Sequence, residues 1–132
     1  MIDIPNNTAL LPGEGTTPMV LTHTTDIAKY VVAMLDLPKW EKAAYIIGSR
    51  VTLKEFVEIA QEVKGVKFDI KYNATAEDWP EAYRMFAGLG NLIEEGWLNM
   101  GNEEGAWILN DIFPDTKAKG VRELLEASWG NK

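Results

Sequence analysis

His23, Thr24 and Asp26 are the residues whose types and positions are best suited to chemistry in this sequence of 132 residues. They follow a short apolar run, Met19 to Leu21, which is typical of a buried strand, and they precede a helical pattern. In α/β proteins, a strand that delivers polar groups to the start of a helix often binds a ligand there. His23 can exchange a proton near neutral pH, so we take His23 and Thr24 as candidate substrate-binding residues.

Each of these residues also has an ordinary structural role. Thr24 or Thr25 can cap the helix, because a hydroxyl accepts the free backbone N–H groups of a first turn. Asp26 places a negative charge where the helix dipole favours one. His23 is the only histidine of the sequence, so it cannot belong to a multi-histidine metal site. The sequence therefore predicts no metal site and no catalytic constellation.

Three aromatic residues, Tyr83, Phe86 and Trp97, lie near one stripe of a helical pattern. They can line an apolar substrate pocket, although aromatic residues at helical spacing are more often part of a core. We keep all three as candidate substrate-binding residues. The adjacent carboxylates Glu94–Glu95 and Glu103–Glu104 diverge on a helix, which indicates solvated surface and not a catalytic pair.

The helix after His23 is expected to end before Pro38, because the residue before a proline avoids helical geometry. Its apolar residues recur at i, i+4, i+7 and i+8, and this stripe is expected to face a core: Ile27, Val31, Met34 and Leu35. Ala44 to Gly48 reads as a continuous apolar strand, as in a parallel sheet that is covered on both faces.

Further along the chain, Thr52 and Glu55 have the spacing of a capping box, and Gly65 can end the helix that they begin. Val66 to Tyr72 alternates strictly, which predicts a strand with one wet face, apart from the covered sheet or at its edge. The other expected elements are a mostly helical segment over 75–97 that is weakened by Gly88 and Gly90, a last helix over 116–129, and irregular chain over 1–16 and 98–115.

Composition limits the classes of partner. The net charge of −7 argues against a nucleic-acid surface or an anionic membrane, both of which require clustered Lys and Arg. The sequence has no cysteine, no apolar run of the roughly 20 residues that span a bilayer, and no basic flank typical of a signal peptide. We expect a single domain over 1–132 in the cytoplasm.

Two long segments carry a resemblance to a known family: PGEGTTPMVLTHTTDIAKYVVAMLDLPKWEKAAYIIGSRVTLKEFVEIAQEVKG and LNDIFPDTKAKGVRELLEASW. Together they resemble the C-terminal, substrate-binding half of NmrA-like and isoflavone-reductase-like proteins, fungal ones in particular. These are atypical short-chain dehydrogenase/reductases. The likeness runs from about Ile2 to Trp129. It implies an α/β fold that is a partial Rossmann-like half, with a short mixed sheet and flanking helices.

The resemblance implies NADP(H) as the cofactor of complete family members, but the features that bind it are missing here. The glycine-rich phosphate loop requires three closely spaced glycines between a strand and a helix, and Gly13 and Gly15 have no third glycine at that spacing. The family's catalytic lysine also belongs to the missing half, so Lys29, Lys39 and Lys42 do not inherit its role. We expect the isolated chain to bind no cofactor.

Two functions of different classes follow. The chain is either the substrate-binding portion of an NAD(P)-dependent reductase in truncated or split form, which acts on a small organic compound, or a non-catalytic module that binds a ligand or regulates. A cofactor-free isomerase or cyclase that reuses the pocket is a third possibility. Because the apolar Ala44–Gly48 strand requires cover on both faces, we also expect a homodimer or a complex with a Rossmann-containing partner.

Overall fold

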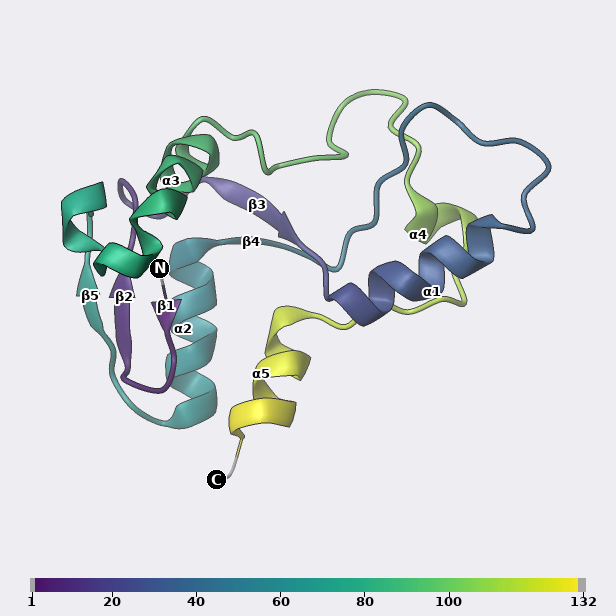
Figure 1. Ribbon diagram of the computed structural model, residues 1–132. Coiled ribbons are helices and arrows are strands. Elements are labelled where there is room, and N and C mark those ends of the chain that lie inside the picture. Colours follow the sequence, from purple (N-terminus) through teal and green to yellow (C-terminus); the bar gives the residue numbers. More distant parts are fainter. Residues whose placement is uncertain (1, 131–132) are drawn as a thin grey trace.

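The computed structural model describes residues 2–130, without the side chains of residues 85–87. Its elements follow one another along the chain as five strands and seven helical segments (Figure 1). They are β1 (Ile2–Asp3), β2 (Thr8–Leu10), β3 (Pro18–Leu21), α1 (Thr24–Met34), β4 (Ser49–Thr52), α2 (Leu53–Lys64), β5 (Asp69–Lys71), the 3-10 helices η1 (Ala76–Asp78) and η2 (Glu81–Phe86), α3 (Ala87–Glu94), α4 (Leu109–Ile112) and α5 (Val121–Trp129).

The strands form two small sheets. In the first, β2 lies between β1, to which it is antiparallel, and β5, to which it is parallel. In the second, β3 pairs antiparallel with β4. The α/β class with a short mixed sheet and flanking helices is therefore confirmed. The prediction that 1–16 is irregular is wrong, because Asn7, at φ 56°, lets the chain turn back so that β1 and β2 pair.

The core lies between the first sheet, α2 and α5. Helix α2 stands beside the sheet and α5 packs on α2 (Figure 1). The buried residues of this core come from all three layers: Ala9, Leu11, Val57, Ala60, Phe68, Val121 and Leu125. The predicted ends of α2 are confirmed, since Thr52 and Glu55 form the capping box and Gly65 ends the helix at φ 67°.

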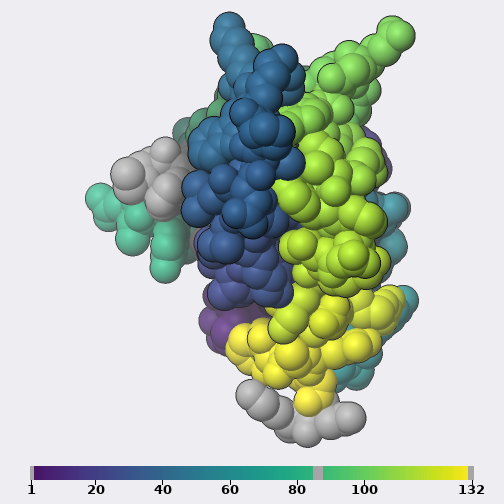
Figure 2. Space-filling view, turned by 90° about the vertical axis from the view of Figure 1, so that its right-hand side faces the viewer, coloured from purple at the N-terminus to yellow at the C-terminus, as the bar shows by residue number. Residues whose placement is uncertain are grey.

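Two sequence predictions fail in the region around α1. Ala44 to Gly48 is not a strand, because only Tyr45 forms a bridge, parallel to Ile108, and the strand begins at Ser49 instead. Continuous apolar character indicates burial, but it does not specify a pairing partner. The chain from the end of α1 to β4 runs beside residues 100–115, as the adjacent blue and green surfaces of Figure 2 show.

The apolar stripe of α1 does not face a core. Ile27 is 40% exposed, Val31 47% and Leu35 63%, and their neighbour Val32 is 65% exposed. The side of α1 that packs on the protein instead carries Asp26 and Tyr30, which are 0% and 1% exposed. The helix therefore presents its apolar side to solvent and its polar side to the rest of the chain.

Candidate functional site

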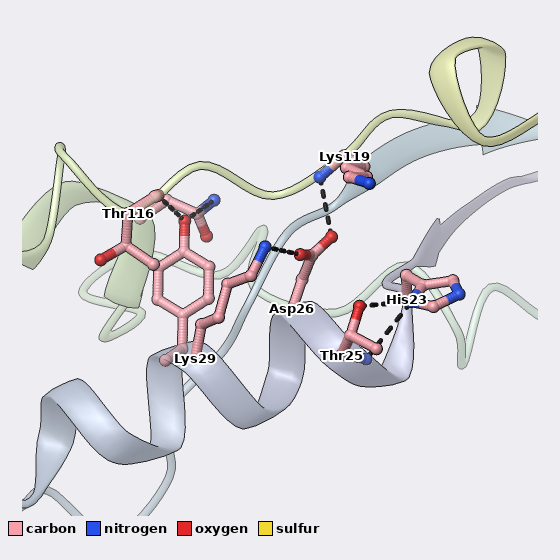
Figure 3. A network of polar contacts seen from close by, with 8 residues as sticks. His23, Thr25, Asp26, Lys29, Thr116 and Lys119 are labelled. Carbon is pink, nitrogen blue, oxygen red and sulfur yellow. Dashed lines mark hydrogen bonds and ion pairs between the residues drawn. The ribbon is translucent and has the colours of Figure 1, made fainter. Parts of the chain in front are cut away.

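The start of α1 is capped by His23. Its backbone is extended (φ −67°, ψ 139°), and its Nδ1 atom accepts a hydrogen bond from the backbone N–H of Thr25 at 3.3 Å. The Thr25 hydroxyl lies 2.7 Å from the same nitrogen (Figure 3). The prediction that Thr24 or Thr25 caps the helix is therefore wrong. The imidazole supplies the acceptor one residue earlier, which a preference for hydroxyl caps does not anticipate.

Asp26 joins this helix start to a distant part of the chain. Its Oδ1 atom accepts from Lys29 Nζ at 2.6 Å, and its Oδ2 atom accepts from the backbone N–H of Lys119 at 2.8 Å (Figure 3). The bond to Lys29 and then the bond to Lys119 hold the pKa of the Asp26 carboxyl below its ordinary value. Asp26 is therefore a buried, ionised anchor as well as a favourable charge in the first turn.

Tyr30 continues the same polar network one turn further along α1. Its hydroxyl donates to the backbone carbonyl of Thr116 and accepts from the side-chain amide of Asn110 at 3.1 Å. The amide of Asn110 also bonds the backbone of Ile47 in both directions, at 2.8 and 3.0 Å. Burial raises the pKa of the Tyr30 phenol. These contacts position α1, α4 and the chain before β4 as one unit.

The start of α1 does not fit the pyrophosphate of a dinucleotide. Such a site requires free backbone N–H groups and close backbone approach at the first turn of a helix. Here the His23 side chain occupies one of those N–H groups, and Asp26 holds a negative charge beside the turn. The capping box of Thr52 and Glu55 closes the start of α2 in the same way.

A cleft lined by the chain's own residues lies between β3, the start of α2, and α3. Its middle part, the apolar chamber, has a volume of about 280 Å³. Side chains from β3, α2, α3 and the loop before η2 form its walls: Met19, Leu21, Phe56, Trp79, Leu89 and Ile93. Met19 and Ile93 are buried, whereas Leu89 is 41% exposed at the opening. The chamber suits the apolar body of a small organic molecule.

One end of the cleft is polar. The polar chamber, of about 400 Å³, adjoins the apolar chamber, because Pro12, Trp79 and Gly90 line both. Its other lining includes the side chains of Asn73, Thr75, Asn91 and Glu94.

The other end of the cleft reaches His23. A third cavity of about 230 Å³, the His23 chamber, shares Leu21 and Phe56 with the apolar chamber. His23 and Lys119 lie at this cavity, and apolar side chains of α5 together with Leu21, Thr22 and Phe56 form its remaining wall. Three adjoining chambers thus follow one another, a polar one, an apolar one and one beside the imidazole of His23.

The sequence-predicted substrate residues do not gather in one place. His23 lines the third chamber, but Thr24 lies exposed on α1 and lines none of the three. Tyr83 is 48% exposed and Trp97 is 68% exposed, with its indole N–H on Glu95 Oε2 at 2.8 Å. The side chain of Phe86 lies outside the described residues. A substrate role for all five residues stays a prediction.

Sequence reasoning missed the residues that line the apolar chamber. Met19 and Phe56 read as core positions of a strand and a helix, and Trp79 lies in the segment over 75–97 that is expected to be mostly helical. Only the packing of β3 against α2 and α3 brings them together, and no local pattern reports that contact. Among the residues that the structure describes, no cluster of side chains could hold a metal ion, and no helix is long and apolar enough to cross a membrane.

Comparisons with curated proteins find fungal oxidoreductases. Oxidoreductase BOA1 of Botryotinia fuckeliana is 34% identical over 86% of this chain, and oxidoreductase swnN of Metarhizium robertsii is 21% identical over 97% of it. The chain spans only 40% and 43% of the lengths of these two relatives. No protein-family model matches the chain.

Comparisons with solved structures find plant reductases. The structure of AtPrR2 with NADP+ and (+)pinoresinol matches 93% of this chain with a TM-score of 0.73 and 25% identity. Leucoanthocyanidin reductase from Vitis vinifera, solved with NADPH, matches 93% of the chain with a TM-score of 0.74 and 14% identity. The chain covers 43% and 45% of those two structures.

Proposed function

The chain resembles part of the NmrA-like and isoflavone-reductase-like oxidoreductases over nearly its whole length, and from this premise we propose that it is the substrate-binding portion of an NAD(P)H-dependent reductase. The substrate is a small organic compound that binds in the cleft beside β3. The nucleotide is bound by a separate part, on the same polypeptide or on a partner chain.

The observation that carries the proposal is the cleft itself. Its apolar chamber is formed by residues from six segments of this chain, so no second chain is needed to form its walls: Ile2 and Ile4, Pro12, β3, the start of α2, Trp79 and α3. Pockets of this kind, apolar with a few polar groups at their ends, are typical of small-molecule sites. The starts of α1 and α2 do not fit a phosphate group, which supports binding of the nucleotide by a part other than this chain.

The outward side of α1 offers a surface to which the nucleotide-binding part can bind. Ile27, Val31, Val32 and Leu35 form an exposed apolar surface, which we call the α1 face. Figure 2 shows α1 in blue at the front of the molecule, with residues 100–115 in green beside it. Contiguous apolar surfaces of this kind mark interaction sites in soluble proteins.

We assign the nucleotide-binding part as the occupant of the α1 face. The curated relatives are more than twice as long as this chain, so they contain enough additional polypeptide to form such a part. The homodimer is the competing occupant, and the net charge of −7 on each copy opposes it.

Association of two purified chains tests this proposal. The chain is mixed with the remaining part of the B. fuckeliana oxidoreductase, expressed separately, and the mass of the complex is measured by light scattering. We expect a one-to-one complex. A chain that stays monomeric in the mixture, or that forms only homodimers, contradicts the proposed partner.

A further inference from the structure

The shape and charge of the cleft beside β3 indicate a class of ligand. Resting on the proposed function, in which this cleft holds the substrate, we propose that it selects a basic amphipathic compound. The apolar body of the ligand lies in the apolar chamber, and a protonated amine lies in the polar chamber near Glu94. An anionic head group is selected against.

The charges at the polar chamber carry the proposal. Glu94 lines this chamber, and within the described residues its carboxylate has no ion-pair partner. A second carboxylate, Glu14, accepts a bond from the side-chain amide of Asn73 at 3.4 Å, and Asn73 also lines the chamber. The amide oxygen of Asn73 is an additional acceptor, and both carboxylates only accept hydrogen bonds. The chamber therefore offers acceptors to a donating, positively charged head group.

The cations nearby are already engaged. Lys71 forms an ion pair with Asp78, and Arg84 donates through Nε to the backbone carbonyl of Trp79 at 3.4 Å. Neither cation lines the polar chamber. Among the described residues, no lysine or arginine lines the polar chamber, and the net charge of −7 adds to the negative potential there.

Glu94 lies beside Gly13 at the wall of the polar chamber. The Glu94 carboxylate occupies the place of a β-carbon on residue 13, so any larger residue there would require this side chain to move. Gly13 also has φ +48°, a conformation that glycine adopts without strain. Glu94 is an exposed residue whose carboxylate lies against Gly13 at the edge of the chamber.

Three probes with one apolar chain and different head groups test the ligand class: octylamine, octanol and octanoate. Each is titrated into the chain by calorimetry at pH 7 and physiological salt. We expect octylamine to bind about tenfold more tightly than octanoate, with octanol between them, because one head group is attracted and the other repelled. Equal affinities, or tightest binding of octanoate, overturn the proposal.

Variants assign the effect to the cleft. Glu94→Gln should reduce the advantage of octylamine over octanoate to about threefold or less and leave octanol unchanged. Glu95→Gln changes the charge equally at a neighbouring residue that does not line the chamber, and it should keep most of the selectivity. Leu89→Asn, at the exposed edge of the apolar chamber, should weaken all three probes alike. Unchanged selectivity in Glu94→Gln overturns the role of Glu94.

The outcomes separate this inference from the function on which it rests. If all three probes bind and Leu89→Asn weakens them, the cleft is a ligand site, whatever the order of the head groups. In that case, a different order of the three affinities overturns the proposed ligand class but leaves the cleft as a ligand site. If none of the probes binds, the cleft is not a site for such ligands, and both proposals fail.

Discussion

The carboxylate of Asp26 accepts the backbone N–H of Lys119 at 2.8 Å, across 93 positions of the sequence. This bond ties the first turn of α1 to the segment that leads into α5. Because the Asp26 side chain is fully buried, it is a structural anchor at the helix start. The imidazole of His23, by contrast, stays exposed beside the third chamber of the cleft.

Removal of the Asp26 charge should destabilise the protein. Asp26→Asn weakens the bonds to Lys29 and Lys119, and we expect the free energy of unfolding to fall by about 2 kcal/mol, as for hydrogen bonds to a buried charged group. Urea unfolding measures the change. Asp36→Asn, at the exposed end of the same helix region, is the matched control and should change it by less than about 0.5 kcal/mol. Equal effects of the two substitutions would contradict the anchor.

The same carboxylate should make stability depend on pH. Its pKa is lower in the folded protein than in the unfolded chain, so its stabilising effect is fully present above the ordinary aspartate pKa of about 3.9. The effect is lost as the pH falls through the lower, folded pKa. Urea unfolding from pH 7 to about pH 2.5 should therefore show a larger loss in the native protein than in Asp26→Asn. Parallel curves for the two proteins would refute this assignment.

Charged substitutions on the α1 face should prevent association without unfolding the chain. Val31→Glu and Val32→Glu place carboxylates at positions that are already 47% and 65% exposed, so stability should change by about 0.5 kcal/mol or less. Light scattering should show loss of the complex with the nucleotide-binding part. Val66→Glu is the matched control, since Val66 is 40% exposed beyond α2. A complex that survives both α1 substitutions excludes this face as the docking site.

Gly13→Ala should cost more than another glycine-to-alanine change at positive φ. Gly13 and Gly96 have φ +48° and +79°, so alanine at either position adopts a strained backbone at a cost of about 1 kcal/mol or more. Only at Gly13 does the new β-carbon also meet a neighbour, the Glu94 carboxylate, whereas nothing lies within 4 Å at Gly96. Thermal unfolding of both variants gives the comparison. A smaller loss of stability in Gly13→Ala would show that Glu94 moves away freely.

Elements whose ends carry local sequence signals can be predicted from the sequence. The capping box at Thr52 and the glycine at position 65 define α2 without any long-range contact. The strand at Met19 and the helix after His23 also follow from local patterns, although the residue that caps the helix does not. Ala44 to Gly48 was misassigned, because its apolar composition reports a preference for burial and not a hydrogen-bonding partner.

Two features depend on tertiary contacts that the sequence pattern does not contain: the cover of the α1 stripe and the cleft. The stripe of Ile27, Val31 and Leu35 shows which side of α1 is apolar, but it cannot show whether the covering polypeptide is part of this chain. The cleft could not be predicted either, because Phe56 and Trp79 are far apart in sequence and meet only through packing. The place of His23 after a strand follows from the sequence alone, and a substrate role for this residue stays a prediction.

Titration of NADPH by calorimetry tests the central claim most directly, because the account separates substrate binding from nucleotide binding. We expect no binding to the chain alone at millimolar NADPH, and saturable binding once the remaining part of the B. fuckeliana oxidoreductase is added. A ligand at 100 times its Kd stabilises a protein by about 2.7 kcal/mol, so the same contrast should appear in thermal unfolding. Saturable NADPH binding by the chain alone would contradict the account.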